Sequence, residues 1–179
     1  RYSRNPINAI HTRLKSNQSI LEKMQRRRIP FSLENLETRI QDVAGVRVIC
    51  SYVDDIYRLS EALLRQDDVK LIAQKDYIQQ PKPNGYRSLH LIVRVPVFFA
   101  DQRRDLPVEV QIRTIAMDFW ASLEHQLKYK QNVPEQEAIV EQLRHCAQRV
   151  SDLDEESWLS AASKPRRTSL PKTTFCWKS

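Results

Sequence analysis

Glycine is almost absent from this sequence of 179 residues, which contains only Gly45 and Gly85. Glycine-rich loops that cradle phosphates are therefore excluded, and neither a GxxxxGK[ST] nor a GxGxxG pattern occurs. The zinc-protease pattern HExxH is also missing. With so few glycines in the chain, we expect Gly85, which lies between Asn84 and Tyr86, to occupy a backbone position that only glycine adopts easily.

Cysteine and long apolar runs are also scarce. Cys50, Cys146 and Cys176 are odd in number and far apart, which argues against a disulfide framework and against a zinc cluster. No apolar run approaches the roughly 20 residues that a membrane-spanning helix needs, and no signal-peptide pattern is present. We therefore expect a cytoplasmic protein without a membrane anchor. The first residue is Arg1 rather than Met, which suggests that further residues precede it.

The composition favours a single basic domain. The hydrophobic content of 41% is enough for a proper core, and 29 Lys and Arg against 22 Asp and Glu give a net charge of +7. A basic surface suits polyanions, which include nucleotides, RNA, DNA and acidic membranes. An ordinary solvated basic face explains the same composition, so charge alone does not decide between these interpretations.

Hydrophobic periodicity predicts mixed helices and strands. The capping-box pattern Ser19-x-x-Glu22 predicts a helix from Ser19 to about Arg27, which Pro30 ends. The β-branched run at 45–53 predicts a buried strand. The other expected elements are a helix at 55–66, strands at 69–78, 88–97 and 106–113, a polar excursion at 101–105, and helices at 114–130 and about 135–158. Because strands and helices do not alternate regularly, we predict an α+β fold, a mixed sheet flanked by helices.

Two segments show clear amphipathic patterns. In the strand at 106–113, three apolar residues alternate with three polar ones: Val108, Val110 and Ile112 against Glu109, Gln111 and Arg113. The last helix carries a narrow apolar seam that suits docking on the body or on another subunit: Ile139, Leu143, Cys146, Val150 and Leu153. From Lys164 on, the sequence is typical of a flexible basic tail. We therefore expect a main domain at 1–133, a C-terminal helix at 134–160 and a tail at 161–179.

Two carboxylates are candidates for a metal site. Asp42 directly precedes the buried strand at 45–53, and Glu109 lies within the strand at 106–113, so a sheet could bring them together. Paired carboxylates suit Mg²⁺, which prefers oxygen ligands and nucleotide phosphates. The alternative is structural: Asp42 caps a turn and Glu109 pairs with an arginine on the next strand.

Two basic segments are candidates for binding a nucleotide. Ser19, Lys23 and Arg26 share one helical face, and Arg13 and Lys15 precede it, an arrangement that suits phosphates or an ordinary solvated face. The second segment is the turn at 81–88, PKPNGYRS, whose tyrosine follows glycine and is flanked by cations. Its tyrosine could stack on a base, or it could fold onto the core.

Taken together, these segments resemble the synthetase domain of the RelA/SpoT family. The matching motifs are R13-L-K15-S-N-Q-S19, D42-V-A-G-V-R47, K75-D-Y, P83-N-G-Y-R-S-L-H90 and E109-V-Q-I-R-T-I-A-M-D-F-W-A-S-L-E124-H. Each motif is weak alone, but all five occur in the family's order between about residues 6 and 130. The short chain resembles a stand-alone small alarmone synthetase.

The resemblance implies a nucleotidyltransferase-like fold and a specific reaction. The β,γ-pyrophosphoryl group of ATP would move to the 3′-hydroxyl of GTP or GDP, giving pppGpp or ppGpp and AMP in the stringent response. Such a transfer needs Mg²⁺ and cations that neutralise the growing charge. Small members of the family are typically tetramers, so we also expect a homo-oligomer.

The same resemblance implies a role for each matched residue. Asp42 and Glu109 would bind Mg²⁺, with Glu109 also the candidate base. Two arginines would sandwich adenine, Arg13 and Arg47. The ATP phosphates would be held by Lys15, Ser19, Lys23 and Arg26. Tyr86 would stack on guanine. The remaining residues would line the acceptor and its phosphates or support that wall: Lys75, Lys82, His90, Gln111, Arg113, Asp118 and Glu124.

Two departures and two alternatives stay open. Asp118 stands where other members carry Asn, so the acceptor preference is open, and the tail after Lys164 matches nothing in the family. Nothing resembles the family's hydrolase domain, so we expect synthesis without degradation. The alternatives are a toxic relative that pyrophosphorylates tRNA or adenosine nucleotides, and a catalytically silent RNA-binding module. The intact pair of Asp42 and Glu109 argues against the silent module, and RNA stays an open candidate partner.

Overall fold

A mixed five-stranded sheet forms the centre of the computed structural model, which describes residues 5–129 and 136–162. The strands lie in the order β1-β2-β5-β4-β3. Only β2 and β5 run parallel, and the other neighbours are antiparallel. The strands are β1 (Ile7–Leu14), β2 (Ala44–Cys50), β3 (Lys70–Asp76), β4 (Leu89–Phe98) and β5 (Arg103–Thr114).

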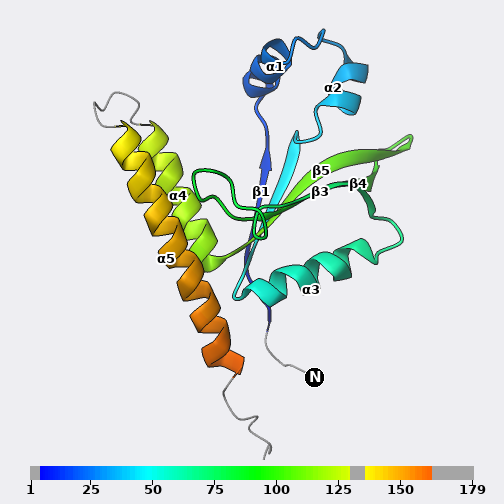
Figure 1. Cartoon of the computed structure of the whole chain (residues 1–179). Helices are drawn as coiled ribbons and strands as arrows, with labels where there is room; N and C mark the ends of the chain where they lie inside the picture. Colours follow the sequence, from blue (N-terminus) through cyan, green and yellow to red (C-terminus); the bar gives the residue numbers. More distant parts are fainter. Residues whose placement is uncertain (1–4, 130–135, 163–179) are drawn as a thin grey trace, which may run out of the picture.

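The helices lie around this sheet (Figure 1). They are α1 (Asn17–Arg26), α2 (Leu33–Arg39), α3 (Val53–Leu64), α4 (Ile115–Tyr129) and α5 (Gln136–Ala162). The pair α1 and α2 stands at one end of the sheet, α3 runs along it, and α4 and α5 lie side by side at the flank (Figure 1). The expected α+β class, with a mixed sheet and a C-terminal helix, is confirmed.

The alternation in β5 divides the sheet into an apolar and a polar face. Val110 and Ile112 are buried in the main core with Val48 of β2, Leu91 of β4 and Ile56 of α3. Burying side chains of this size stabilises the fold by about 1.5–3 kcal/mol each. The intervening polar residues of β5 lie on the opposite face, as expected from their spacing.

Two elements were not predicted from the sequence, and one helix begins earlier than expected. The segment that forms β1 was assigned no structure, and α2 was also missed. Helix α1 begins at Asn17 because Ser16 is its cap and accepts a hydrogen bond from the Ser19 amide. The capping box at Ser19-x-x-Glu22 was therefore wrong by three residues, and Ser19 lies inside the first turn.

The expected polar excursion at 101–105 was also partly wrong, because β5 begins at Arg103. The turn from β4 to β5 is short, with the Phe99 amide donating to the Gln102 carbonyl at 2.8 Å. Strand β4 continues through Pro96 without losing a ladder bond to β3, because β3 pairs with β4 only as far as Arg94. Proline is tolerated where a strand has a neighbour on one side alone.

No helix within the described ranges is long and apolar enough to cross a membrane. The expected domain boundary near residue 133 and the tail after Lys164 lie outside those ranges, so the division of the chain stays a prediction.

Candidate active site

A contact crosses three strands of the sheet. Arg13 of β1, Gly45 of β2 and Glu109 of β5 are paired in one row. The Arg13 side chain passes over Gly45, where a Cβ would lie 3.4 Å from it, an ordinary contact distance. Arg13 Nη2 lies 3.9 Å from Glu109 Oε2. The edge strand thus contributes a cation to the centre of the sheet.

Asp42, just before β2, contacts two lysines. Its Oδ2 accepts hydrogen bonds from Lys15 Nζ at 2.6 Å and from Lys23 Nζ at 2.5 Å. Lys15 directly follows β1, and its amide donates to the Val43 carbonyl. Lys23 comes from α1, which a small second core beside β2 holds in place: Ile20, Met24 and Ile40.

The pKa values of this cluster reflect both burial and the contacts between its charged groups. Burial alone raises the pKa of Asp42, but the bonds from Lys15 and Lys23 outweigh it, so the pKa lies below its ordinary value of 3.8. Burial lowers the pKa of Lys23 from 10.5, and Asp42 opposes that shift only in part. The burial of Lys23 therefore outweighs the attraction of one carboxylate. An anionic ligand beside Lys23 would favour its charged form further.

The other oxygen of Asp42 fits a metal ion. Asp42 Oδ1 is buried and, among the described residues, has no hydrogen-bond partner, which is costly for a carboxylate oxygen unless something binds it. No group of three or more His, Cys, Asp or Glu within residues 5–129 and 136–162 could hold a metal by itself. Mg²⁺ commonly takes only one or two carboxylates and completes its shell with phosphates and water. The donors present therefore fit Mg²⁺ bound together with a nucleotide.

Glu109 lies in a set of donors on the polar face. His90 Nδ1 is 3.4 Å from Glu109 Oε1, and Gln111 Nε2 donates to Glu109 Oε2 at 3.1 Å. The contact with His90 is the main reason that the pKa of Glu109 falls below 4.5, against the opposing effect of burial. The charge of Asp42 opposes this shift. Gly45, three residues after Asp42, pairs with Glu109 in the sheet. The shared metal site of the two carboxylates stays a prediction.

Tyr86 lies among cations beside Glu109. Its hydroxyl is 2.8 Å from His90 Nε2 and accepts from Arg113 Nη2 at 2.5 Å. The ammonium of Lys82 lies 4.6 Å from the centre of the Tyr86 ring, and the guanidinium of Arg113 lies 5.0 Å from it. Cations at this distance are attracted to the ring face. A base that stacks on Tyr86 would therefore share the ring with these cations or displace one of them.

The 81–88 loop, which connects β3 to β4, presents Tyr86 in a tight turn. Gly85 has a φ of 87°, in the region that favours glycine, and its amide donates to the Lys82 carbonyl at 2.8 Å. Asn84 Nδ2 donates to Glu124 Oε1 of α4 at 3.0 Å, which fixes the tip of the loop. The sequence prediction of a turn that requires Gly85 is confirmed.

Asp118 joins the two sets of residues that were expected to hold different nucleotides. Its Oδ1 lies 3.4 Å from Arg47 Nη1 and 3.2 Å from Arg113 Nη1. Arg47 was expected beside adenine and Arg113 beside the acceptor. The first turn of α4 therefore carries a carboxylate that spans from β2 to β5 and holds both arginines.

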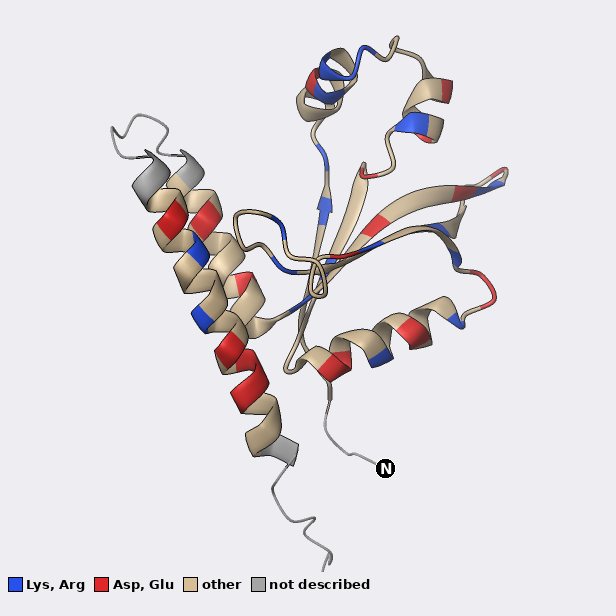
Figure 2. Ribbon diagram, viewed as in Figure 1, with Lys and Arg blue, Asp and Glu red and all other residues tan. Residues whose placement is uncertain are grey.

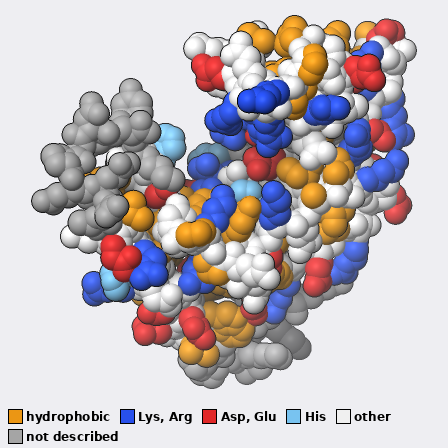
Figure 3. Space-filling view, turned by 45° about the horizontal axis from the view of Figure 1, so that its top comes forward, with side chains coloured by type: hydrophobic (Ala, Val, Ile, Leu, Met, Phe, Trp, Pro, Cys, Tyr) orange, Lys and Arg blue, Asp and Glu red, His pale blue; other side chains and the backbone are white. Residues whose placement is uncertain are grey.

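A cleft of about 260 Å³ opens on the polar face, between β1, β2 and β5. Its lining includes His11, Arg13, Arg47, Glu109 and Gln111. Lys and Arg positions occur on β1 and α1 in the ribbon view (Figure 2), and the space-filling view shows Lys and Arg side chains with acidic and His side chains among them on one face of the molecule (Figure 3). The lining thus combines arginines with a carboxylate, the groups that a site for a metal-bound nucleotide requires.

The structure brings most, but not all, of the expected residues into contact with one another. Ser19 and Arg26 lie on exposed positions of α1, and Lys75 is exposed on β3 opposite His90. Three residues of this region were missed: His11, which lines the cleft, Tyr77, which packs against His90, and Asn84. His11 and Arg13 are two residues apart, so a strand at 7–14 places both on one face.

Comparison with known proteins identifies a family and several relatives. Residues 12–134 match the family described as "Region found in RelA / SpoT proteins". The GTP pyrophosphokinase YwaC of Bacillus subtilis is 43% identical over 155 residues, which cover 87% of this chain and 74% of that protein. The GTP pyrophosphokinase YjbM of the same organism is 43% identical over 153 residues, 84% of this chain and 70% of that protein.

A solved structure agrees with these matches. The small alarmone synthetase 1 from Bacillus subtilis, bound to its product pppGpp, superposes with a TM-score of 0.79 at 41% identity, over 89% of this chain and 81% of that one. Sequence and structure thus lead to the same group of proteins over most of this chain's length.

Proposed function

The chain belongs to the RelA/SpoT family, and from this membership and its site we propose that it is a GTP pyrophosphokinase. It transfers the β,γ-pyrophosphoryl group of ATP to the 3′-hydroxyl of GTP or GDP, forming pppGpp or ppGpp and AMP. The observation that carries this proposal is the 43% identity, over most of the chain, with two proteins named for this activity. The contacts that Asp42 and Glu109 make with lysine and arginine side chains support this proposal.

The residues divide into a donor side and an acceptor side. We propose that Arg13 and Arg47 hold adenine in the cleft, while Lys15 and Lys23 neutralise the ATP phosphates, together with Ser19 and Arg26 on the exposed face of α1. Phosphoryl transfer depends mainly on position and on compensation of charge. On the other side, Tyr86 stacks on guanine. The acceptor and its phosphates are bound or supported by Lys75, Lys82, His90, Gln111, Arg113, Asp118 and Glu124.

Mg²⁺ is the proposed cofactor, held by Asp42 Oδ1 and by Glu109. When bound with ATP, it neutralises charge on the transferred group. The two ammonium groups on Asp42 Oδ2 hold the carboxylate so that its free oxygen keeps one orientation. Both oxygens of Glu109 have protein partners: His90 contacts Oε1, and Arg13 and Gln111 contact Oε2. These contacts fix the orientation of the Glu109 carboxylate.

A low pKa favours the ligand role of Glu109 over its role as base. The hydrogen bond from His90 keeps the pKa of Glu109 below 4.5. A general base works best when its pKa lies near the working pH. Glu109 is therefore fully ionised at neutral pH, which suits a metal ligand, but it accepts a proton weakly.

One assay tests the proposed function against its alternatives. Purified protein is incubated with ATP labelled at the β or γ phosphate and, separately, with GTP, GDP, GMP, ATP alone and tRNA. We expect label in a 3′-pyrophosphorylated guanine nucleotide and release of AMP. Label in tRNA or in an adenosine product would support the toxic-relative alternative. Transfer to none of these acceptors, with RNA bound, would support the silent module.

Tyr86→Ala is expected to raise the KM for the guanine nucleotide about tenfold or more while changing the KM for ATP less than twofold. Stacking of a base on an aromatic ring contributes about 1–3 kcal/mol. Tyr86→Phe keeps the ring but loses the hydroxyl contacts with His90 and Arg113, so it should retain most acceptor affinity. Steady-state kinetics with each substrate varied in turn decide the matter. Equal changes in both KM values would mean that Tyr86 only shapes its loop.

We also propose a homo-oligomer, in the cytoplasm where these nucleotides occur. The apolar seam of α5 is only partly available, because Leu143 and Val150 are half-buried and Trp120 of α4 donates to the Leu143 carbonyl. Leu153, by contrast, is 56% exposed. Leu153 continues the apolar seam beyond the part that packs on α4. An exposed leucine in this position suits contact with a second copy of the chain.

Leu153→Asp is therefore expected to lower the mass measured by light scattering, since a carboxylate in an apolar interface is unfavourable. Arg149→Asp introduces the same carboxylate at another exposed position of α5 and should leave the mass unchanged. A wild-type protein that is already monomeric would refute the proposal directly.

A further inference from the structure

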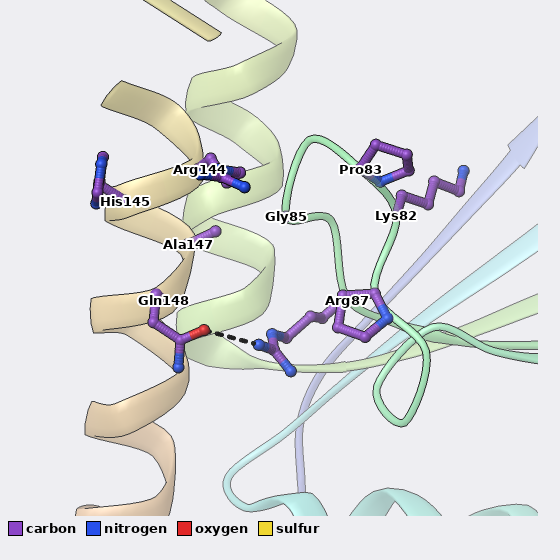
Figure 4. Close-up of a pocket in the computed structure, with 9 residues that line it drawn as sticks. Lys82, Pro83, Gly85, Arg87, Arg144, His145, Ala147 and Gln148 are labelled. Atoms are coloured by element: carbon purple, nitrogen blue, oxygen red, sulfur yellow. Dashed lines mark hydrogen bonds between the residues drawn. The ribbon is translucent and has the colours of Figure 1, made fainter. Parts of the chain in front are cut away.

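A second cavity, of about 450 Å³, lies where the 81–88 loop meets α5 (Figure 4). Its lining is basic, but most of these basic side chains already have partners. Arg144 Nη2 and His145 Nε2 lie 2.8 and 3.2 Å from Glu141 Oε1, and Arg87 Nη2 donates to Gln148 Oε1 at 3.4 Å. The cavity therefore borders a built junction between loop and helix, rather than a set of free cations.

The closest contact of this junction is between Gly85 and Ala147. A Cβ at Gly85 would lie 2.4 Å from the Cβ of Ala147, a distance that atoms do not tolerate. Ala147 is only 4% exposed, so the loop covers it closely. Figure 4 shows Gly85 facing the turn of α5 that carries Ala147. At this point, beside the cavity, the backbone of the loop thus rests directly on the helix.

A second connection joins the same helix to the other side of Tyr86. Arg87 donates to the Ile78 carbonyl and to Gln148 of α5. Six residues further along α5, the buried Asp154 accepts from Thr114, whose hydroxyl oxygen also accepts from the Met117 amide at the start of α4. Helix α5 therefore holds both the 81–88 loop and the end of β5, directly after Arg113.

We propose that Ala147 and Arg87 are positioning residues, through which α5 sets the place of Tyr86 for the guanine nucleotide. This inference rests on the proposed function. Consecutive Cα atoms are about 3.8 Å apart, so Tyr86, which lies between Gly85 and Arg87, cannot keep its place when both neighbours move. The donor side on β1, β2 and α1 has none of these contacts among the described residues. Disturbing the junction should therefore affect the acceptor and spare ATP.

A double-mutant cycle of Gly85→Ala and Ala147→Gly tests this contact. Gly85→Ala alone should raise the KM for GDP at least tenfold, because its Cβ pushes the loop off the helix, with the KM for ATP changed less than twofold. Without the Ala147 Cβ, the next atoms lie 3.7 and 3.8 Å away, which is ordinary contact. The double variant should therefore recover at least threefold of the loss. Recovery is partial because the φ of 87° still strains alanine.

Ala147→Leu provides a second test with a matched control. It should raise the KM for GDP at least tenfold, whereas Ala62→Leu, the same change at an exposed position of α3, should leave both KM values unchanged. Equal increases in both KM values, or no recovery in the double variant, would overturn the positioning role. Melting temperatures of all variants separate a local shift of the loop from general unfolding.

Hydrogen exchange separates failure of this inference from failure of the proposed function. The amides of Gly85 and Lys82 are bonded within the loop, and Ala147→Leu should accelerate their exchange at least tenfold while Ala62→Leu does not. This readout needs no substrate, so it applies even if the wild type makes no alarmone. Unchanged exchange in the loop of Ala147→Leu would refute the contact itself, whatever the activity.

Discussion

Glu109→Gln is expected to lower kcat for pyrophosphoryl transfer by about a thousandfold, because it removes a charge at the centre of the site with almost no change in volume. Loss of one preorganised electrostatic group typically costs about 10²–10³ in rate. The amide can still contact Gln111, but it no longer offsets the charge of Arg13. Single-turnover formation of labelled ppGpp measures the loss. Activity above about a tenth of wild type, a barrier change below about 1.4 kcal/mol, would refute the assignment.

Two controls separate this effect from misfolding. Glu37→Gln makes the same change at an exposed carboxylate that pairs with Arg104, and it should leave the rate unchanged. The second control is pH. Because the folded pKa of Glu109 lies below its ordinary 4.5, its ionised form stabilises the fold above that pH, and this stabilisation is lost as the pH falls through the folded pKa. The difference in Tm between wild type and Glu109→Gln should therefore shrink below pH 4.5.

Asp42→Asn is expected to reduce turnover to a similar extent, but with a different signature. The change removes the free oxygen that suits Mg²⁺ and also leaves Lys15 and Lys23 without their carboxylate. The side chains of these lysines are only 14% and 15% exposed, so their unpaired charges should lower Tm. ATP supplies phosphates to the two released cations. We therefore expect Asp42→Asn to bind ATP without Mg²⁺ at least as tightly as wild type, and to gain little from added Mg²⁺.

Isothermal titration with ATP, with and without Mg²⁺, measures this signature directly. Asp105→Asn is the matched control, because Asp105 also contacts two cations, Lys70 and Arg103, but lies far along the β4–β5 hairpin. It should keep the Mg²⁺ dependence of wild type. A Mg²⁺ response in Asp42→Asn equal to that of wild type would mean that Asp42 only organises the lysines.

The sequence predicted the positions of residues well where the pattern is local. Alternation in β5 placed Glu109, Gln111 and Arg113 on one face, and the scarcity of glycine correctly marked Gly85 as a turn with a positive φ. Both signals depend on neighbours within a few residues. The missed strand β1 is an edge strand with few buried positions, so its apolar pattern was too weak to distinguish it from a loop.

What could not be predicted depends on register between distant strands. Nothing local shows that Arg13 passes over Gly45 to reach Glu109, because that contact needs β1, β2 and β5 paired in one register. The same holds for Asp118, which was assigned to the acceptor side and in fact contacts Arg47 as well as Arg113. The motifs indicated which side chains to group, but the contacts between the groups required the fold.

The parallel pairing of β2 with β5 has a consequence for the newly made chain. Strand β2 ends at Cys50, and its partner begins only at Arg103. During synthesis, Asp42 and the cations of β1 and α1 leave the ribosome before Glu109. Until Glu109 and the rest of β5 follow, one side of β2 has no partner strand. Such non-local pairing is slow to form. An incomplete chain thus holds the donor cations but lacks the second carboxylate, so translation must pass beyond β5 before the protein can make any signal nucleotide.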